Sequence, residues 1–338
     1  NDYQLDADRL IYFTELDSGI AIGDVTLLQN EQKIKADRLE YVKDSKSRAV
    51  SYRAIGNVEI IDSIRTAICG IASYDAKNEE IILNHKPRIT SEDRIIKGEQ
   101  IKLNYTDEVL ERIFIPKNAF ITSASVGYNQ LNIDSSNTLI SFEDRMSSKV
   151  LNGFFVNGSL DSLRLIGMAS TTYHLFEDSL YKGKNLTSGD TIIMRFDEKD
   201  LDDIVVDGGS QGEYVPNKKT NDSDFPLIYS ADRIDYFLKT ETTKLIGNAK
   251  AKHENTDLKA GFIEVNWPSR ILNAFPKQPH DSINQFIKPT IIEKGRDPMV
   301  GNEMTYNLDT KKGKINYGKT KADDGFYKGK EIRNESDK

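Results

Sequence analysis

Residues 36–60 read ADRLEYVKDSKSRAVSYRAIGNVEI, and much of this segment occurs again elsewhere in the chain. ADRLIYFTELDSGIAIGDVTL begins at Ala7, and ADRIDYFLKTETTKLIGNAKA begins at Ala231. Each copy has Ala-Asp-Arg, then Leu or Ile, a Tyr two residues later, and an Ile-Gly-(Asn/Asp) step further on. The distance from the first alanine to that glycine is 20 residues in the quoted copy and 16 in the other two. The segment is therefore an internal repeat whose length varies in its middle, where a hairpin loop is expected.

Apolar and polar residues alternate along most of the chain, which is the pattern of half-buried β-strands. In residues 50–54 every second residue is apolar, and the pattern resumes at residues 58–60 after the Gly56-Asn57 dipeptide, which predicts a turn. A slip in the phase of the alternation at Asp37-Arg38 predicts a β-bulge. Helical periodicity is scarce, and only residues 141–150 are a candidate for a short helix. We therefore predict an all-β chain of many short strands.

A second repeat is shared by residues 98–113 and residues 189–204. In both copies glycine and leucine are 12 residues apart, and an isoleucine follows the leucine after 3. Each copy predicts a strand, an acidic turn and a second strand. A lone hairpin cannot bury its apolar face, so the hairpins are expected to stack into a long sandwich or solenoid. The unequal repeat lengths argue against a β-helix, in which the coils have nearly constant length.

Composition limits the class of protein. The chain has 338 residues, a formal net charge of −7, and 15 tyrosines and 14 phenylalanines, which argue for a folded core. A negative net charge disfavours nucleic acid as a partner, because binding phosphates needs a basic surface. Cys69 is the single cysteine, so it forms no intramolecular disulfide, and its apolar neighbours predict a buried position. No apolar run approaches the roughly 18 residues of a membrane helix, and because the chain begins with Asn1 we expect a mature or excised fragment.

The chemistry-bearing residues do not converge on a catalytic or metal site. The four histidines, at positions 85, 174, 253 and 280, lie far apart and lack the spacing of metal ligands. Carboxylate pairs such as Asp202-Asp203 fall in expected hairpin turns, where acidic residues are common. The sequence therefore predicts no enzyme activity, no metal and no cofactor.

Proline marks one expected boundary. Residues 276–300 hold four of the nine prolines and show little alternation. We therefore predict an array over residues 1–275, in which residues 116–227 continue the same fold with weaker repeats. A proline-rich connector over residues 276–300 and a terminal β unit over residues 301–338 are expected to follow.

Two motifs carry a resemblance to a known family. The first is Ala-Asp-x-(Leu/Ile)-x-Tyr with its later Gly-Asn-(Val/Ala), and the second is the succession Met-x-Tyr-Asn, Thr-x-x-Gly and Asp-Gly-x-Tyr-x-Gly within residues 304–329. Together they resemble the OstA-type domains of lipopolysaccharide transport, which occur as free bridge proteins of the LptA class and as the periplasmic N-terminal domain of LptD. The likeness is clear over residues 1–115 and 228–338, and the N-terminal region of LptD is the nearer form. The chain is longer than a minimal bridge protein and lacks the cysteine pairs that fasten some LptD proteins to their barrels.

The resemblance implies an elongated, twisted and open β-jelly roll, a sandwich of stacked hairpins with an apolar trough along it. It also implies a periplasmic protein, free or attached to the outer membrane, that shields the acyl chains of lipid A and passes them towards the outer-membrane translocon. Alternation predicts the residues that line the trough, which are Ile34, Ala36, Leu39, Tyr41, Val50, Tyr52, Ala54, Val58, Ile60, Leu103, Tyr105, Ile234, Tyr236, Leu245, Ala249, Ala251, Leu258, Ala260 and Ile263.

Partners follow from the open ends of such a stack, because unpaired edge strands can pair with another chain. Residues 8–12 are the expected docking edge for another OstA-type domain, and residues 304–332 are expected to dock against an outer-membrane β-barrel or another partner. Two alternatives remain open at this point: a β-rich surface or adhesin module, and a carbohydrate-active enzyme on a β-sandwich.

Overall fold

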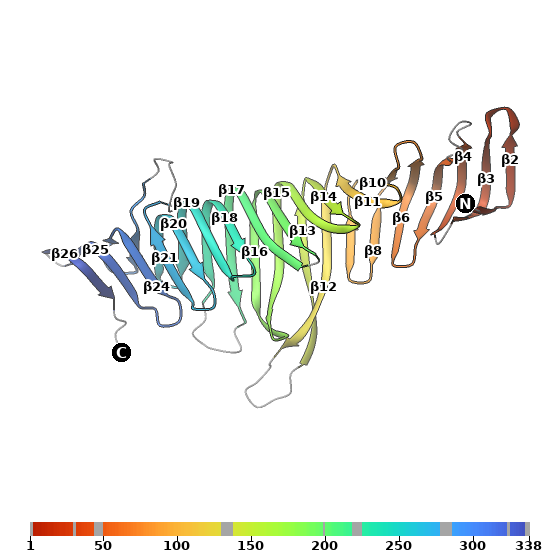
Figure 1. Cartoon of the computed structure of the whole chain (residues 1–338). Helices are drawn as coiled ribbons and strands as arrows, with labels where there is room; N and C mark the ends of the chain where they lie inside the picture. Colours follow the sequence, from red (N-terminus) through yellow and green to blue (C-terminus); the bar gives the residue numbers. More distant parts are fainter. Residues whose placement is uncertain are drawn as a thin grey trace. The chain divides into compact units, whose positions relative to one another are not determined.

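The structure is a computed structural model, and it describes residues 3–29, 32–43, 50–129, 138–198, 200–217, 225–277, 286–322 and 325–334. The chain forms two compact units. Figure 1 labels the strands in chain order. Unit 1 comprises residues 1–125 and 143–167, and unit 2 comprises residues 126–142 and 168–338. Within the described residues the secondary structure is 26 strands and one short 3₁₀ helix, η1 (Thr14–Leu16). The predicted all-β fold class is therefore confirmed.

The strands that lie wholly in unit 1 are β1 (Tyr3–Asp6), β2 (Arg9–Phe13), β3 (Ser18–Gln29), β4 (Gln32–Lys43), β5 (Val50–Ile61), β6 (Arg65–Asp75), β7 (Glu80–Asn84), β8 (Arg88–Ser91), β9 (Arg94–Lys97), β10 (Gln100–Thr106), β11 (Val109–Ile115) and β14 (Val150–Val156). Three strands have residues in both units: β12 (Ala119–Asn129), β13 (Thr138–Ser148) and β15 (Ser159–Glu177).

The strands that lie wholly in unit 2 are β16 (Leu180–Asp197), β17 (Asp200–Pro216), β18 (Leu227–Phe237), β19 (Thr242–His253), β20 (Thr256–Asn266), β21 (Ile271–Phe275), β22 (Thr290–Glu293), β23 (Met299–Val300), β24 (Glu303–Asn307), β25 (Gly313–Ala322) and β26 (Gly325–Asn334). The second repeat forms the hairpins β10–β11 and β16–β17, as its pattern predicts.

The repeated segment of the sequence forms a corner within long strands. Opposite Asp37, residues Gly56 and Asn57 adopt left-handed backbone with φ of +77° and +45°, and the register of β4 with β5 shifts at this point. The side-chain amide of Asn57 donates hydrogen bonds of 3.0 and 3.2 Å to the two carboxylate oxygens of Asp37. The predicted bulge at Asp37-Arg38 is therefore confirmed.

The prediction of a turn at Gly56-Asn57 is wrong, because both residues lie within the continuous strand β5 (Val50–Ile61). Strands β4 and β6 pair with β5 on both sides of the dipeptide, so two left-handed residues bend the strand instead of reversing it. The copy in unit 2 repeats this arrangement, with Asn248 bonded to Asp232 at 2.9 and 3.1 Å. The repeat thus encodes a bend in a continuous strand.

Each bend divides a strand between two leaves of unit 1. Strand β3 pairs with β2 through residues 18–22 and with β1 through residues 26–29. Strand β6 likewise pairs with β7 through residues 71–75 and with β8 through residues 65–68. We name the group with β2, β7, β10 and β11 the first leaf, and the group with β1, β8 and β9 the second leaf.

The predicted helix over residues 141–150 is wrong, because strand β13 (Thr138–Ser148) occupies most of it. Strand β13 pairs with β15. Pairing with a neighbouring strand therefore decides the conformation of a segment whose local pattern is ambiguous.

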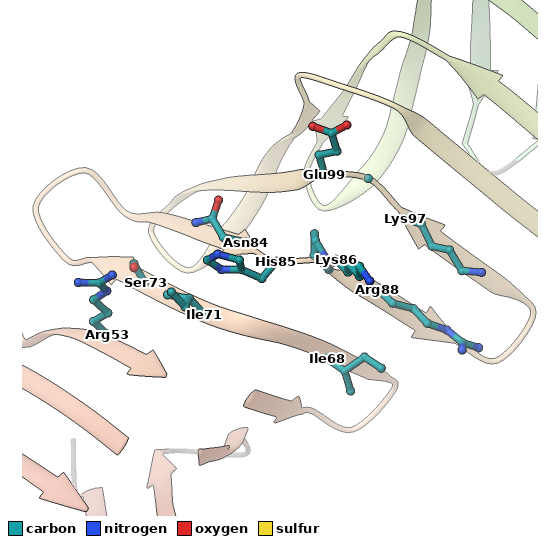
Figure 2. Close-up of a pocket in the computed structure, with 12 residues that line it drawn as sticks. Arg53, Ile68, Ile71, Ser73, Asn84, His85, Lys86, Arg88, Lys97 and Glu99 are labelled. Carbon is teal, nitrogen blue, oxygen red and sulfur yellow. The ribbon is translucent and has the colours of Figure 1, made fainter. Parts of the chain in front are cut away.

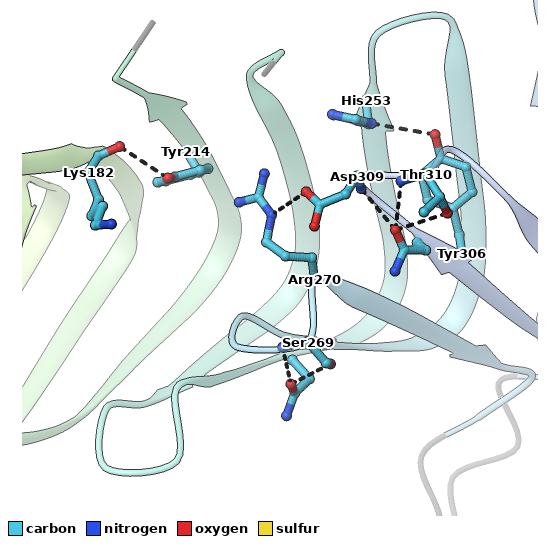
Figure 3. A network of polar contacts seen from close by, with 10 residues as sticks. Lys182, Tyr214, His253, Ser269, Arg270, Tyr306, Asp309 and Thr310 are labelled. Carbon is cyan, nitrogen blue, oxygen red and sulfur yellow. Dashed lines mark hydrogen bonds and ion pairs between the residues drawn. The ribbon is translucent and has the colours of Figure 1, made fainter. Parts of the chain in front are cut away.

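The C-terminal strands are fastened to the rest of unit 2. Strand β24 pairs with β21, while β22, inside the predicted proline-rich connector, pairs with β20. Beside these pairings, Arg270 Nε lies 3.0 Å from Asp309 Oδ1, and His253 Nδ1 lies 3.5 Å from the hydroxyl of Tyr306 (Figure 3). Residues 301–338 consequently belong to the same compact unit as residues 168–275.

Candidate functional site: the apolar interior of unit 1

Register pairs align apolar side chains in continuous rows across the strands of unit 1. A row of the first leaf runs through Leu10, Ala21, Leu39, Ala54, Ala72, Leu83 and Ile101. A row of the second leaf runs through Leu5, Leu27, Ile34, Ile60, Ala67, Ile89, Ile96 and Ile121. Neither row contains a polar side chain, so the interior of this unit presents two apolar walls.

A third row, also in the first leaf, is rich in tyrosine. It runs through Tyr12, Gly19, Tyr41, Tyr52, Tyr74, Ile81, Leu103 and Ile113. The rings of Tyr52 and Tyr74 lie 5.4 Å apart between centroids. Burial raises the pKa of the Tyr52 hydroxyl far above its ordinary value, and the neighbouring Tyr74, Tyr105 and Cys69 raise it further. The hydroxyl of Tyr52 therefore stays neutral, which suits an apolar interior.

The predicted lining residues divide by burial. Fifteen are buried: Ile34, Ala36, Leu39, Tyr52, Ala54, Val58, Ile60, Ile234, Tyr236, Leu245, Ala249, Ala251, Leu258, Ala260 and Ile263. The remaining four, Tyr41, Val50, Leu103 and Tyr105, are half-buried. The structure does not gather all nineteen in one place, because eleven belong to unit 1 and eight to unit 2.

The four half-buried residues lie in the first leaf, towards the strand ends that are distant from the bends. We call them the rim. Burial raises the pKa of Tyr105 in the rim, and the positive charge of Arg65, the first residue of β6, partly offsets this. Arg65 itself pairs with Asp62 at 3.2 Å. Among the predicted lining residues of unit 1, those of the rim are thus the least covered.

Several interior residues escaped the sequence analysis. Ala67, Ala72 and Tyr74 of β6 face the interior, but residues 66–74 read TAICGIASY, and the run of small and apolar residues from 67 to 72 hides the phase of alternation. Cys69 was expected to be buried, and it is 9% exposed. Desolvation raises the pKa of its thiol to about 11.

The interior of unit 2 contains a hydrogen-bonded polar network. The hydroxyl of Tyr236 lies 3.0 Å from Thr187 Oγ1 and 3.1 Å from the hydroxyl of Tyr229. Tyr229 in turn donates to Asn185 Oδ1 at 2.8 Å, and Asn185 Nδ2 donates to the Tyr173 hydroxyl at 3.3 Å. Alternation alone identified Tyr236 as inward-facing but could not reveal that its hydroxyl has partners there.

The first strands of unit 1 leave an apolar edge. Among the described residues, β1 and β2 each pair only with β3, so each keeps one unpaired edge. Leu10, Tyr12, Phe13 and Leu16 are exposed here, and Leu10 continues the first apolar row to this edge. The predicted docking strand therefore coincides with the exposed end of the apolar interior.

The described residues show neither a group of His, Cys, Asp or Glu side chains suited to a metal ion nor a helix with the length and apolarity to cross a membrane.

Fold and interior together define a β-jelly-roll array with an apolar lining. Residues 4–109 match the family described as the LptA/(LptD N-terminal domain) LPS transport protein. The resemblance inferred from the repeated motif is therefore confirmed for this segment, which contains both apolar rows of unit 1 except for Ile121.

Comparison with solved structures finds LptH, described as the LptA homologous periplasmic component of the conserved lipopolysaccharide transport device from Pseudomonas aeruginosa. The match has 15% sequence identity and a TM-score of 0.30, and it covers 32% of this chain and 80% of that one. Curated protein sequences give no match.

Proposed function

We propose that this protein acts in lipopolysaccharide transport in the periplasm, shielding the acyl chains of lipid A and passing them towards the outer-membrane translocon. The observation that carries the proposal is the pair of uninterrupted apolar rows in the segment that matches the transport family. Each acyl CH₂ left in water costs about 0.8 kcal/mol, so several chains cannot cross an aqueous space unaided. Facing apolar walls offset this cost.

In this proposal the rim is the side through which acyl chains enter unit 1. Tyr41, Val50, Leu103 and Tyr105 are the least covered of the predicted lining residues there, and tyrosine suits a boundary between apolar and wet surroundings. In this proposal the eight predicted lining residues of unit 2 also contact acyl chains. At Tyr236 a lipid chain would meet the polar network around Asn185 and Thr187, so unit 1 supplies the more apolar surface.

Adjacent residues of β5 test the trough directly. Tyr52 is buried and faces the interior, whereas Arg53 is exposed on the outer face. We expect a photo-crosslinking amino acid at Tyr52, or at Ile60, to capture lipopolysaccharide in cells through its acyl chains, and the same probe at Arg53 to give almost no crosslink to an acyl chain. Mass spectrometry of the crosslinked product identifies the lipid, and circular dichroism checks that each variant is folded. Equal labelling of acyl chains at Tyr52 and Arg53 would contradict an interior lipid path.

We further propose that another OstA-type domain adds to the unpaired edges of β1 and β2. This pairing would satisfy free backbone groups and join two apolar interiors, because Leu10 carries the first row to the edge. Charged residues on edge strands prevent such additions.

Leu10→Asp tests this edge, since Leu10 is 57% exposed and its replacement should leave the fold intact. We expect its association with an LptA-class bridge protein, measured by biolayer interferometry, to weaken by about tenfold or more. Ile64→Asp is the matched control, because Ile64 is 69% exposed in a turn away from the edge, and its affinity should stay unchanged. If both variants bind as the wild type does, this edge is not the docking site.

A further inference from the structure

A cleft opens on the outer face of unit 1 where a strand breaks instead of bending. Between β7 and β8, residues His85 and Lys86 have φ of +62° and +59°, and Pro87 follows. A second break, at Gly98 and Glu99, separates β9 from β10. The cleft has a volume of about 830 Å³, which is within the usual range of small-molecule sites, roughly 300–1,000 Å³ (Figure 2).

Four permanent cations line this cleft: Arg53, Lys86, Arg88 and Lys97. Within the described part of the chain, none of them has an ion pair or a side-chain hydrogen bond. The acidic residue of the lining, Glu99, is already engaged by Lys117 at 2.9 Å and by Asn118 at 2.6 Å. In a chain with a formal net charge of −7, this concentration of unpaired positive charge is a local feature.

Two of these cations face each other directly. Arg88 and Lys97 are register partners in the β8–β9 pair, and their side chains extend in the same direction (Figure 2). Like charges opposite one another in an antiparallel pair destabilise it. In addition, Arg88 Nε is buried without a hydrogen-bond partner, which costs free energy. An anion between the two side chains would offset the repulsion between Arg88 and Lys97.

We propose that this cleft is a binding site for a phosphate-bearing molecule. Arginine binds phosphate through paired N–H donors, and the lysines add charge without fixed geometry. Ile68 and Ile71 provide an apolar surface beside the cations, against which the uncharged part of a phosphorylated sugar can pack. The ligand is a phosphorylated lipid headgroup or free phosphate, since both offer the same group to Arg88 and Lys97. The site lies outside the apolar interior and does not depend on lipid carriage.

The test uses isothermal titration calorimetry at low ionic strength with the whole chain. One probe is inorganic phosphate, and the other is a deacylated, phosphorylated glucosamine disaccharide, which carries the headgroup chemistry without acyl chains. We expect saturable binding of at least one probe, weakened by about tenfold or more in Arg88→Gln and in Lys97→Gln. Binding of the disaccharide alone assigns the site to a headgroup, whereas equal binding of phosphate assigns it to the free anion.

Lys77→Gln is the matched control, because Lys77 is exposed in the turn between β6 and β7, outside the cleft, and the same charge is removed. Its affinity for either probe should stay within about twofold of the wild type. An absence of saturable binding to the wild-type chain, or an equal loss in Lys77→Gln, would overturn the proposal. Thermal unfolding shows that the glutamine variants are folded, and lipid capture at Tyr52 should be unchanged by Lys97→Gln, which separates this site from the trough.

Discussion

Replacing Gly261 with alanine should lower the free energy of unfolding of unit 2 by about 3 kcal/mol. A Cβ atom at this position would overlap the carbonyl oxygen of Pro276 and lie 2.6 Å from its carbonyl carbon. Both are backbone atoms, so no side-chain rotation can relieve the contact. Hydrogen bonds also fix the backbone around Pro276 relative to Gly261. Gly261 N donates to Ile287 O and Ile287 N donates to Pro276 O, each at 3.0 Å. The added methyl group must therefore push strands apart.

Gly295→Ala is the matched control for this substitution. Gly295 has φ of +83°, and a Cβ there would meet no atom within 4 Å, so its replacement costs only the left-handed backbone strain of about 1 kcal/mol. Gly261 has no positive φ, so the two variants separate contact from backbone strain. Urea unfolding followed by circular dichroism gives both free energies. A loss in Gly261→Ala no greater than that in Gly295→Ala would show that β20 and the Pro276 segment are not closely packed.

Alkaline pH should unfold the protein well before ordinary tyrosine ionisation is complete. Burial raises the pKa of Cys69 from 9.0 to about 11, and it raises the pKa values of Tyr52, Tyr229 and Tyr236 far above the ordinary 10.0. The unfolded chain loses these protons first, so it binds fewer protons than the folded chain. Their contribution to stability is complete below pH 9 and falls as the pH rises from there towards the folded pKa values. In this pH range each fully buried group lowers the free energy of unfolding by about 1.4 kcal/mol per pH unit.

The measurement is the urea midpoint at a series of pH values from about 8 to about 11, with tyrosinate absorbance recorded in parallel. We expect a constant midpoint below pH 9, a steep fall above pH 10, and tyrosinate that forms together with unfolding. Tyr52→Phe should reduce the steepness, whereas Tyr327→Phe should not, because Tyr327 is 56% exposed. A midpoint that stays constant to the highest pH would mean that water reaches these hydroxyls in the folded chain.

Period-2 alternation was reliable wherever polar residues mark the phase. Val50, Tyr52 and Ala54 are separated by Ser51 and Arg53, and the structure places the intervening Arg53 on the outer face. The same reasoning gave no assignment for β6, where apolar residues occupy both faces around Cys69 and hide the phase.

Predicting turns from dipeptide composition was less reliable than predicting strands from alternation. Gly56-Asn57 has the composition of a hairpin turn and the left-handed backbone that such a turn needs, yet it bends a continuous strand. A dipeptide specifies its own φ values, but whether the chain reverses depends on the strands that pair on either side. The hydrogen bonds between Asn57 and Asp37 explain why the repeated motif contains both an aspartate and, 20 residues later, an asparagine.

The sequence by itself determined the all-β class, the left-handed backbone at the repeated glycine step and most of the inward-facing residues, because these depend on local φ preferences and on which side chains avoid water. The tertiary structure alone decided what non-local pairing brings together. Register between β8 and β9 sets Arg88 against Lys97, and the packing of unit 2 joins Tyr236 to Asn185 through Tyr229. These contacts decide how charges and hydroxyls that are distant in the sequence interact. Electrostatic and hydrogen-bond energies depend on distances between such groups, and no local sequence pattern contains those distances.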